Sequence, residues 1–223
     1  MDKELTCEVD KDVFRERLNR YTIMAFNMLP KLDKPKILDI GCGSGVPTIE
    51  LARLSNGEIT GIDINGHFLD KLNRKAKREG LSDRVNTINC SMFDLFFPEG
   101  SFDIIWAEGA IAVIGFERGL KEWGRFLKPR GFLVAHDEAT DIKKKLMQVF
   151  SCGYELLGYF QLYEDIWWNE YYGPLERQII EVRGRCVNDP KMLMELDSSQ
   201  HEIDMFKRDP ESNRSVFFVM QKK

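Results

Sequence analysis

The residues best suited to chemistry lie close together in the first third of the chain. Residues 37–45 read Ile-Leu-Asp-Ile-Gly-Cys-Gly-Ser-Gly, and Asp63 follows at the end of the next expected strand. Glycines after a strand let the backbone approach a ligand closely and lead into a helix whose N-terminal amides face it. An acid one strand later is placed to accept both hydrogen bonds of a ribose diol. The spacing therefore predicts a site for a nucleoside-bearing ligand.

The same segment argues against a ligand held by its phosphates. The dinucleotide fingerprint G-x-G-x-x-G needs a third glycine where this chain has Val46, and no phosphate loop ending in G-K-[ST] is present. A nicotinamide oxidoreductase is therefore disfavoured.

Strands and helices alternate around this segment, which predicts an α/β protein with a parallel sheet and helices on both faces. An amphipathic helix is expected first, over residues 13–29. The spacing of apolar residues then predicts strands at 36–40, 58–63, 84–90, 102–107 and 132–136, and helices at 47–54, 67–78, 116–127 and 141–152.

The pattern changes after Cys152. A strand is expected at 154–162, then helices at 175–187 and 190–206, then a last strand at 215–220. The helical pair is thus expected as an insertion between the final two strands. With no Gly/Ser-rich linker, we expect one domain over 1–223: an N-terminal helical lid (1–34), a ligand-binding core (35–152), and C-terminal strands (153–223) with inserted helices at 174–208.

The composition is that of a globular protein without a basic field. Of 223 residues, 43% are hydrophobic and 30% charged, and the formal net charge is −4, which disfavours nucleic acid as a partner. The odd number of cysteines and the lack of a C-x-x-C pair predict reduced thiols and no metal site. These are Cys7, Cys42, Cys90, Cys152 and Cys186. No apolar run reaches the roughly 18 residues of a membrane span, so we expect a cytoplasmic protein with no membrane partner.

Over residues 35–138 the chain resembles class I S-adenosylmethionine-dependent methyltransferases, especially the small-molecule group like the ubiquinone/menaquinone-biosynthesis enzymes. Residues 37–45 satisfy that family's first motif at every position. The resemblance implies a Rossmann-like, doubly wound sheet of seven mostly parallel strands with an antiparallel last strand. It also implies S-adenosyl-L-methionine as cofactor and S-adenosyl-L-homocysteine as product.

The resemblance assigns roles along the motif. It implies that Asp39 and the backbone around Gly41 and Gly43 hold the methionine end of the cofactor, and that Gly45 belongs to the same cofactor-binding loop. Asp63 would take the ribose hydroxyls. A carboxylate near the cofactor's ammonium group is favourable, because opposite charges attract and this cofactor has no phosphate.

The resemblance also implies an adenine site. Ile64 would pack on the adenine, and Ser91, Met92 and Phe93 match the adenine-binding stretch, with Ser91 where the family often has an acid. A hydroxyl can still accept the hydrogen bond from the exocyclic amine. Further on, Arg130 replaces a glycine in the turn that usually reads Lys-Pro-Gly-Gly.

Four residues are candidates for the reacting end of the site. Tyr21 either packs in the core or closes over the cofactor, as an N-terminal aromatic often does in this family. Glu108 either caps the following helix or touches cofactor or substrate. His136 and Glu138 lie where the fifth strand ends, and either can act as a general base or be merely hydrogen-bonded.

Aromatic residues are candidates for a substrate pocket. Trp106 lies on the strand whose end should border the transferable methyl. Trp167, Trp168, Tyr171 and Tyr172 crowd into six residues. They are either packing aromatics or the wall of a pocket whose π faces favour a sulfonium or a cationic substrate.

The leading hypothesis is methyl transfer to an N, O, S or C nucleophile of a small molecule by in-line displacement. An RNA or protein methyltransferase, and a non-catalytic protein of the same fold, stay open as alternatives. The inserted helices also allow a homodimer through one apolar face, formed by Leu175, Ile179, Val182 and Cys186.

Overall fold

The computed structural model describes residues 9–185 and 189–223, and these form two compact units. The first, the core unit, comprises residues 19–161 and 215–223. The second, the helical unit, takes in the stretch ending at Leu18 and residues 162–214. The expectation of a single domain therefore stays a prediction.

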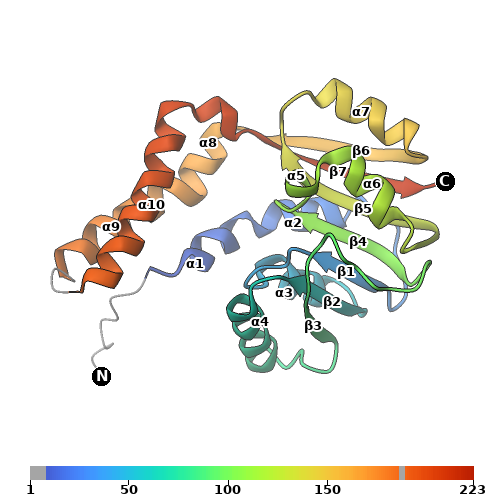
Figure 1. Ribbon diagram of the computed structural model, residues 1–223, viewed down its shortest axis with the longest axis horizontal. Helices are drawn as coiled ribbons and strands as arrows, with labels where there is room; N and C mark the ends of the chain where they lie inside the picture. The colour runs from blue at the N-terminus through green and yellow to red at the C-terminus, as the bar shows by residue number, and fades with distance from the viewer. Residues whose placement is uncertain (1–8, 186–188) are drawn as a thin grey trace. The chain divides into compact units, whose positions relative to one another are not determined.

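The core unit is built on a seven-stranded sheet with the order β3-β2-β1-β4-β5-β7-β6 (Figure 1). Parallel pairing joins β1 through β5, whereas β7 runs antiparallel to β5. The predicted fold class, including the antiparallel last strand, is confirmed. The strands are β1 (Lys36–Ile40), β2 (Glu58–Asp63), β3 (Val85–Asn89), β4 (Phe102–Glu108), β5 (Leu127–Glu138), β6 (Tyr154–Leu162) and β7 (Ser215–Lys222).

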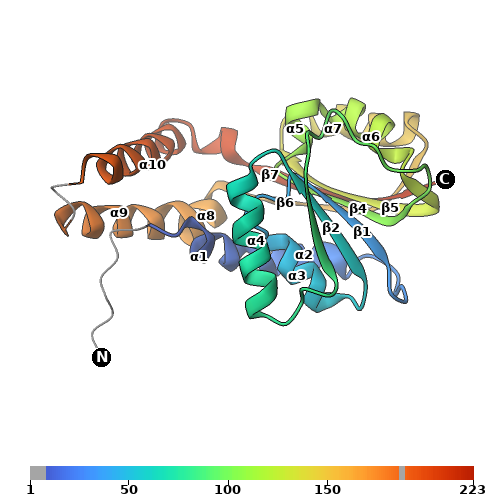
Figure 2. The ribbon, with the colours of Figure 1, turned by 60° about the horizontal axis from the view of Figure 1, so that its bottom comes forward.

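Helices cover both faces of this sheet (Figure 2). One face carries α2 (Asn19–Phe26), α3 (Val46–Leu54) and α4 (Gly66–Arg78), which pack in sequence against one another. The other carries α5 (Ile111–Ile114), α6 (Phe116–Gly124) and α7 (Ile142–Ser151). The central strands β1 and β4 are buried almost throughout, as expected of strands covered on both sides.

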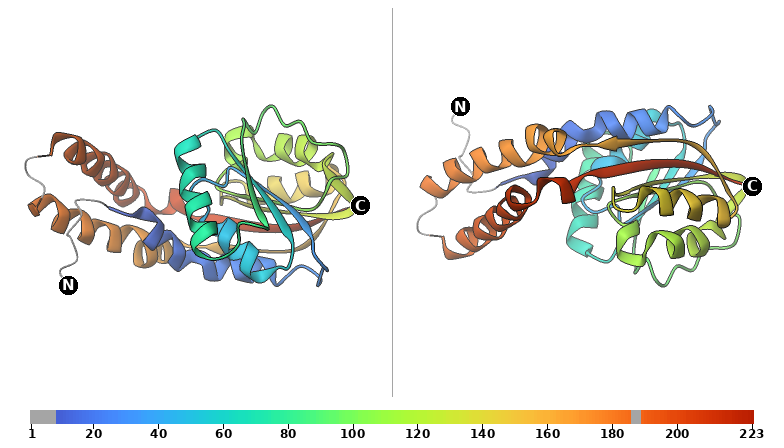
Figure 3. Two further views of the ribbon diagram at one scale, coloured as in Figure 1. Left: turned by 90° about the horizontal axis from the view of Figure 1, so that it is seen from below. Right: turned by 90° about the horizontal axis from the view of Figure 1, so that it is seen from above.

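The helical unit has its own apolar core. Its long helices α9 and α10 pack side by side (Figure 3). The elements are α1 (Lys11–Arg15), η1 (Glu16–Leu18), α8 (Glu164–Trp167), the π-helical turn η2 (Trp168–Tyr172), α9 (Gly173–Arg185), α10 (Pro190–Arg208) and η3 (Pro210–Asn213). The predicted insertion between the last two strands is confirmed, although the expected end of its first helix, Val187, lies outside the described residues.

The expected helix over 13–29 is wrong as a single element. It divides into α1, η1 and α2, because its apolar residues serve two cores: Phe14 and Leu18 pack in the helical unit, whereas Ala25 is buried in the core unit.

The fifth strand begins five residues earlier than expected, at Leu127. Arg130 within it takes φ +63°, the left-handed conformation that the family's glycine would adopt more easily. The turn is therefore kept despite the substitution.

Candidate cofactor-binding and active site

The carboxyl ends of the parallel strands bring several of the predicted site residues to one edge of the sheet. Ile40, the last residue of β1, pairs with Ile62 of β2, and Glu108, the last of β4, pairs with His136 of β5. Ligands of open α/β sheets bind at this edge, where the strand order reverses. Here that point lies between β1 and β4.

The glycine loop is held against β2 by its own backbone. The amides of Gly41 and Cys42 both donate to the carbonyl of Ile62 at 2.9 Å. The glycines then differ in what surrounds them. A Cβ on Gly45 (φ +83°) would lie 2.2 Å from Cδ1 of Leu72, whereas nothing lies within 4 Å of a Cβ on Gly43 (φ +53°). Gly45 is therefore needed for packing, and Gly43 faces space that a ligand can use.

Asp39 is a buried acid behind this loop, 2% exposed. Its Oδ2 accepts a hydrogen bond from Oγ1 of Thr48 at 2.6 Å. Burial raises the pKa of Asp39 to about 7, and the Thr48 hydrogen bond opposes that rise. The negative charges of Glu108 and Asp63 raise the pKa further. Two neighbouring acids therefore act on Asp39, and a cationic ligand group would stabilise its carboxylate form.

Asp63 is held in place by backbone donors on both oxygens. Oδ2 accepts from the amide of Gly43 at 2.9 Å, and Oδ1 accepts from the amide of Asn65 at 2.8 Å. Each carboxylate oxygen has a second lone pair for a ligand hydroxyl. The next residue, Ile64, is 76% exposed.

The turn after β3 carries the three residues of the expected adenine site. Oγ of Ser91 accepts from the amide of Phe93 at 3.2 Å, which shapes the turn. The carbonyl of Met92 accepts from Nε1 of Trp123 at 3.4 Å. The ring of Phe93 is exposed, with the guanidinium of Arg118 5.5 Å from its centre.

Glu108 is fixed by two neutral donors. Its Oε1 accepts from Oγ1 of Thr22 and from Nε1 of Trp106, both at 2.8 Å. Trp106, expected in a substrate pocket, is fully buried and supports Glu108. Tyr21, the neighbour of Thr22, is half-buried, and its ring lies 6.4 Å from that of Phe160.

His136 lies beside Glu108 on the next strand. Its ring stacks on Phe217, with centroids 4.1 Å apart and planes inclined by 7°. Its Nε2 lies 2.8 Å from Oγ of Ser215. Glu138 is exposed two residues further along β5, and its carbonyl accepts from Nζ of Lys145 at 2.6 Å.

The aromatic run lies in the helical unit, where it contributes to the core. Tyr171 and Tyr172 are 6% and 9% exposed, and Trp168 stacks on Phe206 at 5.9 Å. These contacts match the packing alternative, and a role for Trp167, Trp168, Tyr171 and Tyr172 in a substrate pocket stays a prediction.

The suggested dimer face is buried in the same core. Leu175, Ile179 and Val182 are at most 6% exposed and pack with residues of α10. A homodimer through the inserted helices stays a prediction. Cys186, the fourth residue of that face, lies outside the described residues.

Sequence reasoning missed three hydroxyl groups, those of Thr48, Thr22 and Ser215. Thr48 lies on the first turn of α3, nine residues after its partner Asp39, and Thr22 lies 86 residues before its partner Glu108. Only the position of Thr48 directly after the glycine loop was a usable signal.

The cysteines that the structure describes form no disulfide. Cys42, Cys90 and Cys152 are free thiols, and Cys7 and Cys186 lie outside the described residues. Residues 9–185 and 189–223 contain no group of three or more metal-ligating side chains. Among the same residues, no helix has the length and apolar character needed to cross a membrane.

Comparisons with known proteins agree with this geometry. Residues 37–131 match a family model described as a methyltransferase domain. The 27-O-demethylrifamycin SV methyltransferase of Amycolatopsis mediterranei is 32% identical over 123 residues, which are 55% of this chain and 45% of that protein. The matches span less than half the length of the curated relatives.

Solved structures share the fold over most of the chain. An S-adenosylmethionine-dependent methyltransferase from Thiobacillus denitrificans, in complex with S-adenosyl-L-homocysteine, has a TM-score of 0.74 and 17% identity, covering 92% of this chain and 91% of that one. The [4+2]-cyclase SpnF has a TM-score of 0.75 and 19% identity, covering 92% and 80%. The resemblance to class I S-adenosylmethionine-dependent methyltransferases is thus confirmed in the motif segment and in the fold.

Proposed function

We propose that this protein transfers a methyl group from S-adenosyl-L-methionine to an N, O, S or C nucleophile of a small molecule. The observation that carries the proposal is the convergence of Asp39, Asp63 and Glu108 beside a glycine loop with open space at Gly43. Anionic phosphates would be repelled by these acids, whereas a ligand with ammonium and sulfonium charges would be attracted.

The binding residues divide by the part of the cofactor that each would hold. Asp39 and the loop of Gly41, Gly43 and Gly45 would hold the methionine end, and Asp63 the ribose diol. The adenine would lie against Ile64 and the turn of Ser91, Met92 and Phe93. The rim would be completed by Tyr21 and Glu108.

The chemistry needs alignment more than activation. When bound, the cofactor supplies a sulfonium leaving group, so the nucleophile's electron pair forms the new bond to carbon as the carbon–sulfur bond breaks. Glu108, immobilised by two donors, would orient the reacting groups. Where the nucleophile carries a proton, His136 is the base we favour, because it is half-buried beside Glu108, whereas Glu138 is exposed.

A protein of the same fold shows why methyl transfer itself must be measured. One neighbour with the same fold is described as a [4+2]-cyclase, so the fold alone does not specify methyl transfer. A small-molecule acceptor is supported over RNA by the net charge of −4.

The test is turnover with a methyl-labelled cofactor and a library of small amines, phenols, thiols and carbon acids, followed by mass spectrometry. We expect label in an acceptor together with stoichiometric S-adenosyl-L-homocysteine. D63N should reduce turnover at subsaturating cofactor by at least about tenfold, since a charged hydrogen-bond acceptor is lost. D70N, an exposed acid on α4, is the control and should match the wild type. Equal turnover in D63N and wild type would contradict the proposed site.

A further inference from the structure

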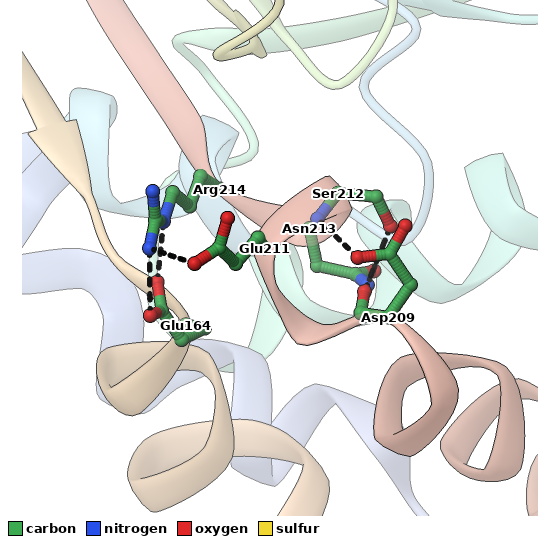
Figure 4. Close-up of polar contacts among 6 residues, drawn as sticks. All are labelled: Glu164, Asp209, Glu211, Ser212, Asn213 and Arg214. Atoms are coloured by element: carbon green, nitrogen blue, oxygen red, sulfur yellow. Dashed lines mark hydrogen bonds and ion pairs between the residues drawn. The ribbon is translucent and has the colours of Figure 1, made fainter.

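Glu164 and Arg214 join two stretches of chain that lie 50 residues apart in the sequence (Figure 4). Nε of Arg214 donates to Oε2 of Glu164 at 2.6 Å, and Nη2 donates to Oε1 at 2.9 Å. The guanidinium also lies 5.6 Å from the ring centre of Tyr163. Two parallel hydrogen bonds fix the relative orientation of the two side chains, which a single contact does not.

The ion pair lies where the chain passes between the sheet and the inserted helices. Glu164 is the first residue of α8, directly after the connection from β6, and Arg214 is the last residue before β7. The pair therefore ties together both connections that lead between the sheet and the inserted helices, at the point where they belong to the helical unit. The Arg214 hydrogen bonds lower the pKa of Glu164 to about 2, so the pair stays ionised through neutral pH.

A tight turn, η3, directly precedes Arg214. Oδ1 of Asp209 accepts from the amide of Ser212 at 3.3 Å, and the carbonyl of Asp209 accepts from Nδ2 of Asn213 at 3.0 Å (Figure 4). These contacts fold η3 back on itself immediately before Arg214. The backbone directly before Arg214 is therefore held by local contacts within the helical unit.

The residue that follows Arg214 contacts the candidate active site. Ser215 begins β7, and its Oγ lies 2.8 Å from Nε2 of His136. The ring of His136 stacks on Phe217, two residues further along β7, and its backbone pairs with that of Glu108. The first residues of β7 thus hold the imidazole by one hydrogen bond and one ring face.

We propose that Glu164 and Arg214 are positioning residues for the acceptor side of the methyl-transfer site, acting through Ser215 on the ring of His136. The role in catalysis rests on the proposed function. The expected effect of the ion pair on the ring of His136, through Ser215, does not depend on the proposed function. Cofactor binding should not need the pair, because the residues assigned to the cofactor lie on other elements.

The test follows His136 directly in the full-length protein. The chain has three histidines, so their ring nitrogens can be resolved by NMR and assigned by substitution. In R214Q and E164Q we expect the His136 ring signals to shift toward those of S215A, which lacks the hydroxyl. Amide exchange over residues 214–218 should accelerate about fivefold, as expected for loss of a partly exposed ion pair.

Two further variants separate positioning from general damage. The charge-swapped E164R/R214E should restore slow exchange and the wild-type His136 signals. E211Q should have no effect on either, because Glu211 makes only a single contact to Arg214 and its side chain is 73% exposed. Amide exchange in β3 should be unchanged in every variant.

Calorimetry with S-adenosyl-L-methionine distinguishes failure of this inference from failure of the proposed function. We expect unchanged cofactor affinity in R214Q and, once an acceptor is identified, a raised KM for it with the cofactor KM unchanged. Wild-type His136 signals and exchange in R214Q would overturn the inference. Lack of cofactor binding by the wild type would instead overturn the proposed function and leave the coupling to be judged by the His136 signals.

Discussion

At the scale of single residues, Asp39 makes the site sensitive to pH. Its pKa is raised from 3.8 to about 7, chiefly by burial, so its neutral form is favoured in the folded protein. Its contribution to folding stability is therefore complete below its unfolded pKa and is lost as the pH rises through about 7. A cationic ligand reverses this preference, because it stabilises the carboxylate.

Cofactor affinity should consequently fall as the solution is acidified. Below about pH 7, binding must be accompanied by loss of the Asp39 proton, so the dissociation constant should rise by up to about tenfold per pH unit. Calorimetry between about pH 5.5 and pH 8, in buffers of different ionisation enthalpy, measures both the affinity and the proton released. D39N should bind the cofactor weakly, and its affinity should lack the pH dependence that Asp39 causes. A slope in D39N equal to that of wild type would assign the proton to another residue.

Removing the Thr48 hydroxyl tests whether its hydrogen bond helps to set the pKa of Asp39. The hydrogen bond from Thr48 lowers the pKa of Asp39, so T48V should raise that pKa and move the loss of affinity to higher pH. Unchanged pH dependence in T48V would show that this hydrogen bond does not set the protonation of Asp39.

At the scale of elements, the sequence predicted the strands and site residues whose pattern is contained in one short stretch of chain. Residues 36–40 and 102–107 were recognisable as strands because burial on both faces favours largely apolar runs. Asp39, the glycines and Asp63 were recognisable because their spacing is local. The contacts of Thr22 with Glu108 and of Ser215 with His136 join residues 86 and 79 positions apart, so only the folded sheet reveals them.

Two glycines of the loop, Gly43 and Gly45, should respond differently to substitution by alanine. G45A places a methyl group against Leu72 at a positive φ, and should lower the free energy of unfolding by about 3 kcal/mol. G43A meets no neighbour and should cost only about 1 kcal/mol from its backbone conformation, but should weaken cofactor binding by obstructing the ligand's approach. Urea denaturation and calorimetry on both variants check this. A stable G45A, or a G43A with normal cofactor affinity, would contradict the division of roles.

At the scale of the whole molecule, two compact units are formed from interleaved parts of one chain. The core unit carries all residues assigned to the cofactor, whereas the aromatic run is packed within the helical unit. Composition could not reveal this division, because no linker separates the units and the first amphipathic stripe continues from one into the other.

The most direct test of the central claim is calorimetric titration of the purified protein with S-adenosyl-L-methionine and, separately, with NAD. We predict a single site with a dissociation constant on the order of micromolar for the former and no binding of the latter. D63N should lose most of that affinity while D70N retains it. Binding of NAD without binding of S-adenosyl-L-methionine, or equal affinity in D63N and wild type, would contradict the account.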